Sequence, residues 1–140
     1  MIVIVCSGLI VHGEKILLIR ERKVDKYGLP GGKLEEGESL RDCLRRELKE
    51  ELGAETTIRD LVMVTEKPRT HENNTVLKFI YRAEVIETVI EPELSYDYYD
   101  QAQIEDIITS GKLRGKDVEQ VIRTHYSSML ISLPEPILFT

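Results

Sequence analysis

A helix between Ser39 and Gly53 is the feature of this sequence that most constrains its fold. The apolar stripe of this helix consists of leucines at every fourth position: Leu40, Leu44, Leu48 and Leu52. Ser39 with Asp42 three residues later resembles a capping box, and Gly53 is suited to a left-handed C-cap. Because a single apolar stripe needs one apolar surface to pack on, we expect this helix to lie against a sheet.

The other apolar segments predict that sheet and further helices. Segments rich in β-branched and aliphatic residues predict strands over 2–11 (interrupted near Ser7-Gly8), 16–19, 61–64 and 76–85. Helices are expected over 101–110 and 116–131, polar or acidic loops over 67–74 and 87–95, and an extended tail over 133–140. Strands on both sides of the first helix, with more helices at the end, predict an α/β fold with helices on both faces of a mixed sheet.

Composition narrows the class of protein. A chain of 140 residues fits one domain, which we expect to cover residues 1–140. Its formal charge of −6 disfavours a non-specific binder of nucleic acid or anionic membranes. No apolar run is long enough for a membrane span, and no basic residue precedes the apolar N-terminal segment, so no secretory signal is expected. The dispersed Cys6 and Cys43 indicate reduced thiols in a cytoplasmic protein, not a disulfide or zinc site.

The helix also carries three glutamates on one side, namely Glu47, Glu50 and Glu51. On an α-helix they fall within about 100° of arc, beside the leucine stripe. Carboxylates crowded on one turn repel one another unless positive charge lies among them. Arg46 supplies part of that charge by reaching Glu50 at i+4, and Mg²⁺, which prefers oxygen ligands and bridges to phosphates, is the stronger partner. The alternative is a solvated helix face in which Lys49 and Arg45 are the ion-pair partners.

A glycine-rich segment precedes the helix, and a spaced set of residues continues from it into the helix. The set consists of Gly32, Glu38, Arg46, Glu47, Glu50, Glu51 and Gly53, with the aliphatic Leu48 after Glu47. In identity and spacing these residues resemble the Nudix hydrolase signature. Ala54 departs from it, since the family usually has a larger aliphatic residue there. The preceding segment 27–32 is similar to the family's usual lead-in, with Tyr27 where tryptophan is more common.

The resemblance implies a fold, a reaction and a role for each matching residue. The implied fold is a Nudix-type α/β/α sandwich with a mixed central sheet. Family members usually cleave a nucleoside diphosphate linked to another moiety, X, using Mg²⁺ or Mn²⁺ and an attacking water. The metal-ligating and catalytic carboxylates would be Glu47, Glu50 and Glu51. The orienting residues would be Glu38 and Arg46, and the residues that shape the loop beside the substrate would be Gly31 and Gly32.

Residues outside the signature add candidates. The family often uses a further glutamate as general base, and the acidic loop offers Glu93 first and Glu91 second; the alternative for each is a solvated loop charge. A basic cluster lies beside the signature and consists of Arg20, Arg22, Lys23 and Lys26. One or two of these residues could bind phosphate, and the alternative is that the cluster is only an exposed charged loop. Three tyrosines could stack on a base or pack on the sheet, with packing favoured for at least one: Tyr96, Tyr98 and Tyr99.

We therefore expect metal-dependent hydrolysis of a pyrophosphate linkage in a small-molecule nucleoside diphosphate-X substrate, of nucleotide, nucleotide-sugar or ADP-ribose type. Pro68, 15 positions beyond Gly53, is similar to the proline of ADP-ribose-type members. One alternative is a Nudix-fold module that binds a nucleotide without cleaving it, and another is a structural protein with an acidic helix. The intact carboxylates and the lack of room for a DNA-binding domain disfavour the binding module. No membrane partner is expected, and the resemblance favours a homodimer.

Overall fold

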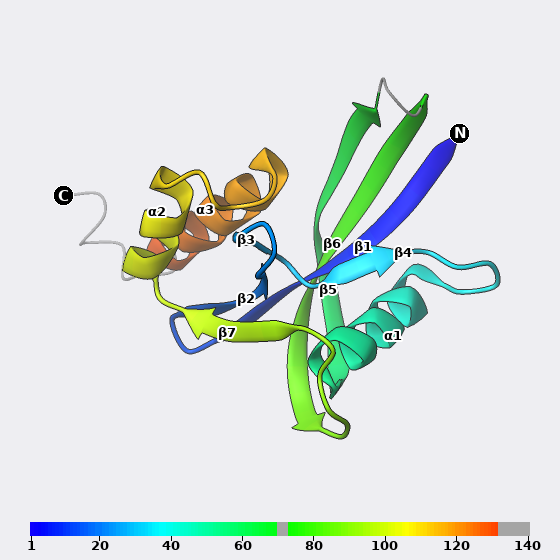
Figure 1. Cartoon of the computed structure of the whole chain (residues 1–140), viewed down its shortest axis with the longest axis horizontal. Coiled ribbons are helices and arrows are strands. Elements are labelled where there is room, and N and C mark those ends of the chain that lie inside the picture. Colours follow the sequence, from blue (N-terminus) through cyan, green and yellow to red (C-terminus); the bar gives the residue numbers. More distant parts are fainter. Residues whose placement is uncertain (70–72, 132–140) are drawn as a thin grey trace.

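The computed structural model describes residues 1–69 and 73–131, and its elements follow one another in a mixed order of strands and helices (Figure 1). The strands are β1 (Ile2–His12), β2 (Lys15–Glu21), β3 (Lys26–Gly28), β4 (Gly31–Lys33), β5 (Ala54–Arg69), β6 (Asn74–Thr88) and β7 (Ser95–Tyr99). The helices are α1 (Leu40–Leu52), α2 (Gln101–Thr109) and α3 (Lys116–Ile131). The expected extended tail over 133–140 lies outside the described residues.

Strand β1 joins two parts of one mixed sheet. Over Ile2 to Ile10 it runs parallel to β6, whereas at Val11 and His12 it pairs antiparallel with β2. The strand order is β3-β2-β1-β6-β5, with β4 added to β1 and β7 added to β2. The predicted mixed sheet is therefore confirmed, and among the strands of the described residues β1 and β6 form the one parallel pair, in the middle of the strand order.

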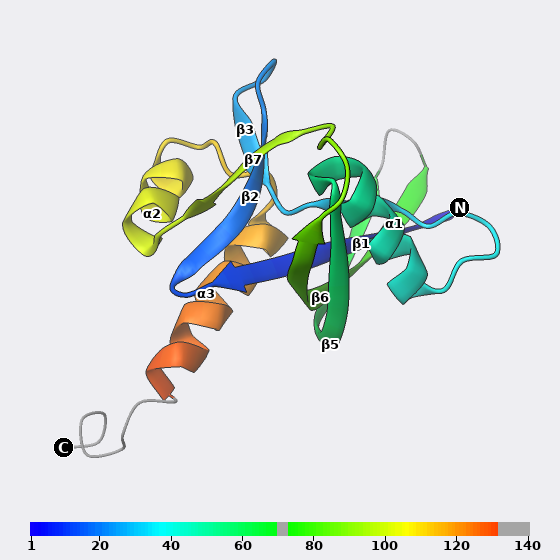
Figure 2. The same ribbon diagram turned by 90° about the horizontal axis from the view of Figure 1, so that it is seen from below.

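The helices cover opposite faces of this sheet, α1 on one and α2 with α3 on the other (Figures 1 and 2). Strand β2 contributes side chains to both faces, because successive side chains of a strand point to opposite sides of the sheet. Leu17 packs in the core that contains α1, and Leu18 packs in the core that contains α2 and α3. The apolar run of β2 is thus buried on both faces, as expected for the middle layer of an α/β/α sandwich. The predicted fold class is confirmed.

Several expected boundaries are wrong. Strand β1 is not interrupted at Ser7-Gly8, because both residues stay in register with β6 and the bare Cα of Gly8 lets Leu48 pack closely. Strands β5 and β6 are much longer than the expected 61–64 and 76–85, since they pair with each other along nearly their whole length. Backbone pairing in this long hairpin offsets the weak strand preference of its polar residues.

The acidic loop is shorter than expected, because β6 extends to Thr88 and β7 begins at Ser95. The three tyrosines of β7 pack on the sheet, Tyr96 and Tyr98 toward the core of α1 and Tyr99 toward that of α2 and α3. Packing of these side chains, expected for at least one, is therefore found for all three. Within the described part of the chain, no helix is long and apolar enough to cross a membrane.

Candidate active site

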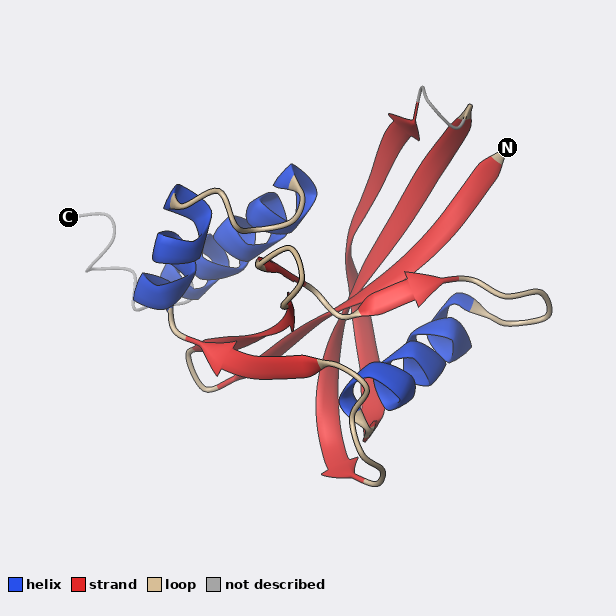
Figure 3. Ribbon diagram, in the orientation of Figure 1, coloured by secondary structure: helices blue, strands red, loops and turns tan. Residues whose placement is uncertain are grey.

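Helix α1 lies beside the strands of the sheet (Figure 3), and it is held in place at its ends and along its buried side. The Ser39 hydroxyl accepts a hydrogen bond of 3.1 Å from the Asp42 amide, which is half of the expected capping box, while the Asp42 carboxylate instead pairs with Arg45. Gly53 ends the helix at φ 69°, the predicted left-handed cap. Leu44, Leu48 and Leu52 are fully buried. A helix fixed in this way is a rigid support for the glutamates on its other side.

The connection between β6 and β7 closes the C-terminal end of α1. The Val89 and Ile90 amides both donate to the Gly53 carbonyl, the Glu93 amide donates to the Glu50 carbonyl at 3.3 Å, and the Leu94 amide donates to the Glu51 carbonyl at 3.1 Å. These bonds satisfy carbonyls that a helix end leaves unpaired. They also bring the backbone of Glu93, the first candidate for the general base, against the end of α1.

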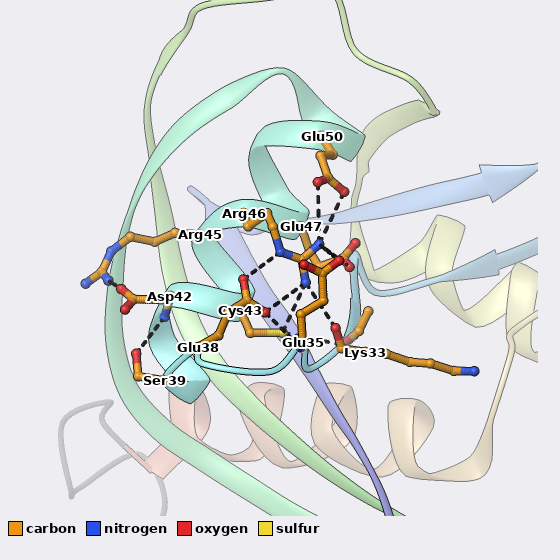
Figure 4. A network of polar contacts seen from close by, with 11 residues as sticks. Lys33, Glu35, Glu38, Ser39, Asp42, Cys43, Arg45, Arg46, Glu47 and Glu50 are labelled. Atoms are coloured by element: carbon orange, nitrogen blue, oxygen red, sulfur yellow. Dashed lines mark hydrogen bonds and ion pairs between the residues drawn. The ribbon is translucent and has the colours of Figure 1, made fainter.

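Arg46 lies at the centre of the carboxylate cluster (Figure 4). Its guanidinium forms a two-pronged contact with Glu38, with Nε to Oε2 at 2.6 Å and Nη2 to Oε1 at 3.0 Å. Nη1 reaches Glu47 at 3.0 Å and Glu50 at 3.4 Å, and Nη2 also donates to the Lys33 carbonyl. The Arg46 guanidinium lowers the pKa of Glu38 below its usual range.

The alternative of a solvated, ion-paired helix face does not match these contacts. Lys49 pairs with Glu55 at 3.1 Å and Arg45 pairs with Asp42 at 2.8 Å. Neither cation contacts Glu47, Glu50 or Glu51 within the described residues. Apart from Arg46, the helix therefore leaves these carboxylates without the partners that this alternative required.

Glu51 is the most perturbed carboxylate of the cluster. Its Oε1 accepts a hydrogen bond of 2.7 Å from the Gly31 amide. Burial raises the pKa of Glu51 to about 7, and the neighbouring charges of Glu47, Glu50 and Glu93 add to the rise, whereas the Gly31 hydrogen bond opposes it. Burial also raises the pKa of Glu47. Raised pKa values from burial and mutual repulsion are typical of a functional carboxylate cluster.

Two glycines allow the loop to lie against both the sheet and the helix. A side-chain carbon at Gly31, whose φ is 150°, would overlap the Cys6 carbonyl of β1. A side-chain carbon at Gly32 would overlap the Glu47 carboxylate. Residues without a Cβ are therefore needed at both positions for this close approach.

Glu51 lies in the wall of a pocket of about 550 Å³, here called the central pocket. Its polar wall contains Ser7, Glu21, Gly31, Glu51, Lys78 and Arg114, and its apolar wall includes Ile19, Leu29 and Val118. Glu21 and Leu94 also border a second pocket of about 320 Å³, here called the basic pocket. Other residues of the basic pocket are Arg20, Arg22, Lys23, Glu93 and Ser95.

The structure places some of the candidates from the sequence in the walls of these two pockets, whereas neither wall includes Gly32, Glu38, Arg46, Glu47 or Glu50. Gly31 and Glu51 line the central pocket, and Arg20, Arg22 and Glu93 line the basic pocket. Arg20 also pairs with Asp25 at 2.9 Å. The Lys26 ammonium donates to the Gly111 carbonyl at 2.7 Å, so this charge is already engaged. Glu91 is exposed and lines neither pocket.

Ser7, Lys78 and Arg114 are pocket residues that the sequence did not reveal. They lie on β1, on β6 and in the connection between α2 and α3, and no shared motif links them. Only the pairing of β1 with β6 and the packing of α3 on the sheet bring them together.

The donor set fits a hard divalent cation. Glu47, Glu50 and Glu51 offer carboxylate oxygens, the ligands that Mg²⁺ prefers. Within the described residues no group of three His, Cys, Asp or Glu side chains is already arranged around a metal position. Arg46 is the present counter-charge between Glu47 and Glu50. A bound cation would offset both the desolvation and the repulsion between carboxylates that raise the pKa of Glu51.

An α/β/α sandwich with this carboxylate helix against a glycine loop defines a Nudix-type domain. The family model described as NUDIX domain matches residues 3–112, so the chain belongs to the Nudix family, as its resemblance implied. The prediction of a Nudix hydrolase is thus confirmed at the level of the family.

Two relatives match part of the chain. The 8-oxo-dGDP phosphatase NUDT18 of Danio rerio is 37% identical over 75 residues, which cover 51% of this chain and 21% of that protein. An ADP-ribose pyrophosphatase of Methanocaldococcus jannaschii is 32% identical over 83 residues, which cover 57% of this chain and 49% of that protein. The matches thus span about a fifth and about half of the lengths of these relatives.

Solved structures share the fold over nearly the whole chain. A NUDIX hydrolase from Nitrosomonas europaea superposes with a TM-score of 0.77 at 20% identity, covering 91% of this chain and 90% of that one. The solution structure of the E. coli ORF135 protein gives a TM-score of 0.74 at 22% identity and covers 94% of each chain. At these identities the likeness concerns the fold alone.

Proposed function

We propose that this protein hydrolyses the pyrophosphate linkage of a nucleoside diphosphate-X substrate and requires a divalent metal ion. The observation that carries the proposal is the Glu51 carboxylate, which is hydrogen-bonded to Gly31, raised in pKa by burial and repulsion, and part of the central pocket wall. Burying a carboxylate costs free energy, and a cation bound between Glu51 and a diphosphate would compensate that cost.

Glu47, Glu50 and Glu51 would hold Mg²⁺ or Mn²⁺. The bound ion would offset phosphate charge and help orient the attacking water. Arg46 and Glu38 would fix the directions of the carboxylates, because their two-pronged contact restrains the guanidinium between Glu47 and Glu50. Gly31 would orient Glu51 through its amide, and Gly32 would leave room for Glu47.

Glu93 would accept the proton of the attacking water as general base. Its backbone bond to Glu50 and its electrostatic effect on Glu51 support this role, and its place in the basic pocket would let it meet a bound diphosphate. Arg20 and Arg22 in the same pocket would neutralise phosphate oxygens. Lys26 would have to release the Gly111 carbonyl to take part.

The proposed substrate class comprises nucleotides, nucleotide sugars and ADP-ribose-type compounds. The names of the two relatives refer to 8-oxo-dGDP and ADP-ribose, both nucleoside diphosphate derivatives. Pro68 pairs with Thr75 on the β5–β6 hairpin.

We further propose that residues 1–140 act as a single domain, since β1 and β2 contribute to both cores.

A product assay tests the proposal with nucleoside triphosphates, ADP-ribose, nucleotide sugars, dinucleoside polyphosphates and capped RNA, each with Mg²⁺, Mn²⁺ or chelator. We expect one class to be cleaved only with metal, and Glu51→Gln to lower turnover at least about 100-fold. Glu55→Gln is the control, because Glu55 pairs with Lys49 away from both pockets. Nucleotide binding without any product under either metal would instead support the binding module.

A further inference from the structure

The polar wall of the central pocket contains two cations that are each already paired with a carboxylate. Arg114 Nη2 lies 2.9 Å from Glu21 Oε2, and Lys78 Nζ lies 3.0 Å from Asp117 Oδ2. With Glu51, three carboxylates therefore accompany two cations. A further phosphate would be repelled there, whereas an uncharged group with both hydrogen-bond donors and acceptors could bind the paired side chains.

The remaining wall suits a flat ring. Ile19, Leu29 and Val118 are all buried and present apolar surface to the pocket. Ser7 is only 3% exposed and adds a hydroxyl, which can both donate and accept, beside this apolar surface. Apolar walls with a few polar groups on one side are typical of sites that bind a planar heterocycle.

The connection between α2 and α3 fixes the backbone of Arg114 at this wall. The Arg114 amide donates to the Tyr27 carbonyl at 2.7 Å, and the Tyr27 amide donates to the Lys112 carbonyl at 2.8 Å. Arg114 is thus fixed beside β3, with its Cβ above Gly28. It also lies just beyond residues 3–112, the part of the chain that matches the family model.

We propose that the central pocket binds the nucleobase of the substrate, and that Arg114 with Glu21 determines which base is preferred. Arg114 donates to ring or carbonyl acceptors of the base, and Glu21 accepts from its N–H groups. The diphosphate then extends past Glu51 toward the basic pocket, where Arg22 and Lys23 lie. The assignment rests on the proposed function, because it names the substrate group that this site selects.

The assignment is tested by the kinetics of Arg114→Ala. The substrates are four nucleoside diphosphate glucoses, which carry uracil, adenine, guanine or cytosine, and ribose 5-diphosphate, which has no base. We expect KM for the preferred substrate to rise at least about tenfold, the preference among bases to narrow, and kcat to stay within about twofold. KM for ribose 5-diphosphate should not change. Glu21→Gln should also alter the preference among bases.

Arg59→Ala is a matched control. Arg59 pairs with Glu84 at 2.9 Å with exposed fractions of 52% and 56%, close to the 2.9 Å, 58% and 42% of Arg114 and Glu21, but lines neither pocket. An unchanged KM and base preference in Arg114→Ala would overturn the assignment. So would an equal rise of KM for ribose 5-diphosphate, since that result indicates a phosphate contact.

Calorimetry separates this inference from the proposed function. If the wild-type protein cleaves none of the compounds, binding of the same nucleotides is measured in both variants. Binding at least about tenfold weaker in Arg114→Ala than in Arg59→Ala would retain the base site while rejecting hydrolysis. Equal binding in the two variants, or no binding to the wild type, would reject the base site.

Discussion

The carboxylate of Glu47 lies directly against the bare Cα of Gly32, in the space that a side-chain carbon on residue 32 would need. Glu47 is held there by Arg46 and is largely buried, with only 15% of its side chain exposed. The loop glycine and the helix glutamate, 15 residues apart, therefore form a single steric unit. Any residue larger than glycine at position 32 must displace the carboxylate or the loop.

Gly32→Ala is expected to lower turnover by about 100-fold with little loss of helix content, because a small displacement of a catalytic group is costly. Steady-state kinetics and circular dichroism measure the two effects. Gly8→Ala is the control, since a Cβ there makes only ordinary contacts of 3.6–3.8 Å with Leu48 and Ala83. Full activity in Gly32→Ala would show that Glu47 need not occupy this position.

Arg46→Lys is expected to lower the melting temperature by about 4 °C or more and to weaken activation by Mg²⁺. A lysine cannot reproduce the two-pronged contact with Glu38 while also reaching Glu47 and Glu50. Arg45→Lys, one residue earlier, changes an exposed pair with Asp42 and should have almost no effect. Equal melting temperatures for the two variants would contradict a structural role for the Arg46 contacts.

Glu93→Gln is expected to lower kcat by about 100-fold if Glu93 accepts the proton of the attacking water. Glu91→Gln should retain nearly full activity, because Glu91, unlike Glu93, borders neither pocket. The pH dependence of kcat distinguishes a lost base from a displaced loop. The opposite order of effects would move the role of general base to Glu91.

Mg²⁺ together with a non-hydrolysable substrate analogue is expected to raise the free energy of unfolding. At a ligand concentration 100 times Kd the rise is about 2.7 kcal/mol, because ligands that bind only the folded state stabilise it by mass action. Thermal melts with metal, with analogue, with both and with chelator measure this effect. A Glu47→Gln, Glu50→Gln double variant should lose the metal-dependent part, and an undiminished shift in that variant would place the metal elsewhere.

His125 is expected to stay neutral at pH values where an exposed histidine is protonated. Burial lowers the pKa of His125, and the neighbouring Arg82, with Nη1 3.5 Å from His125 Nδ1, lowers it further. Because the unfolded chain binds this proton more strongly, stability should decline as the pH falls below about 6.5, and less steeply in His125→Gln. NMR titration of the ring would contradict this expectation with a midpoint at or above 6.5.

The sequence predicted the local features of α1 correctly, because these features depend on residues that are close together along the chain. The leucine stripe of α1 and the contact of Arg46 with Glu50 follow from helical periodicity, and the limits of α1 follow from its capping residues Ser39 and Gly53. The spacing of the signature residues also identified the family. The lengths of β5 and β6 did not follow, because their polar stretches form strands only through pairing with each other.

The tertiary structure alone decided what surrounds the carboxylates. Burial of Glu51, its bond to Gly31 and the closure of the α1 end by residues 89–94 depend on groups that fold together from distant segments. The central pocket likewise joins Ser7 of β1, Lys78 of β6 and Arg114 after α2. Sequence spacing determines which side chains share one helix face, whereas desolvation and contacts between separate elements exist only once the sheet has formed and α1 and α3 have packed on it.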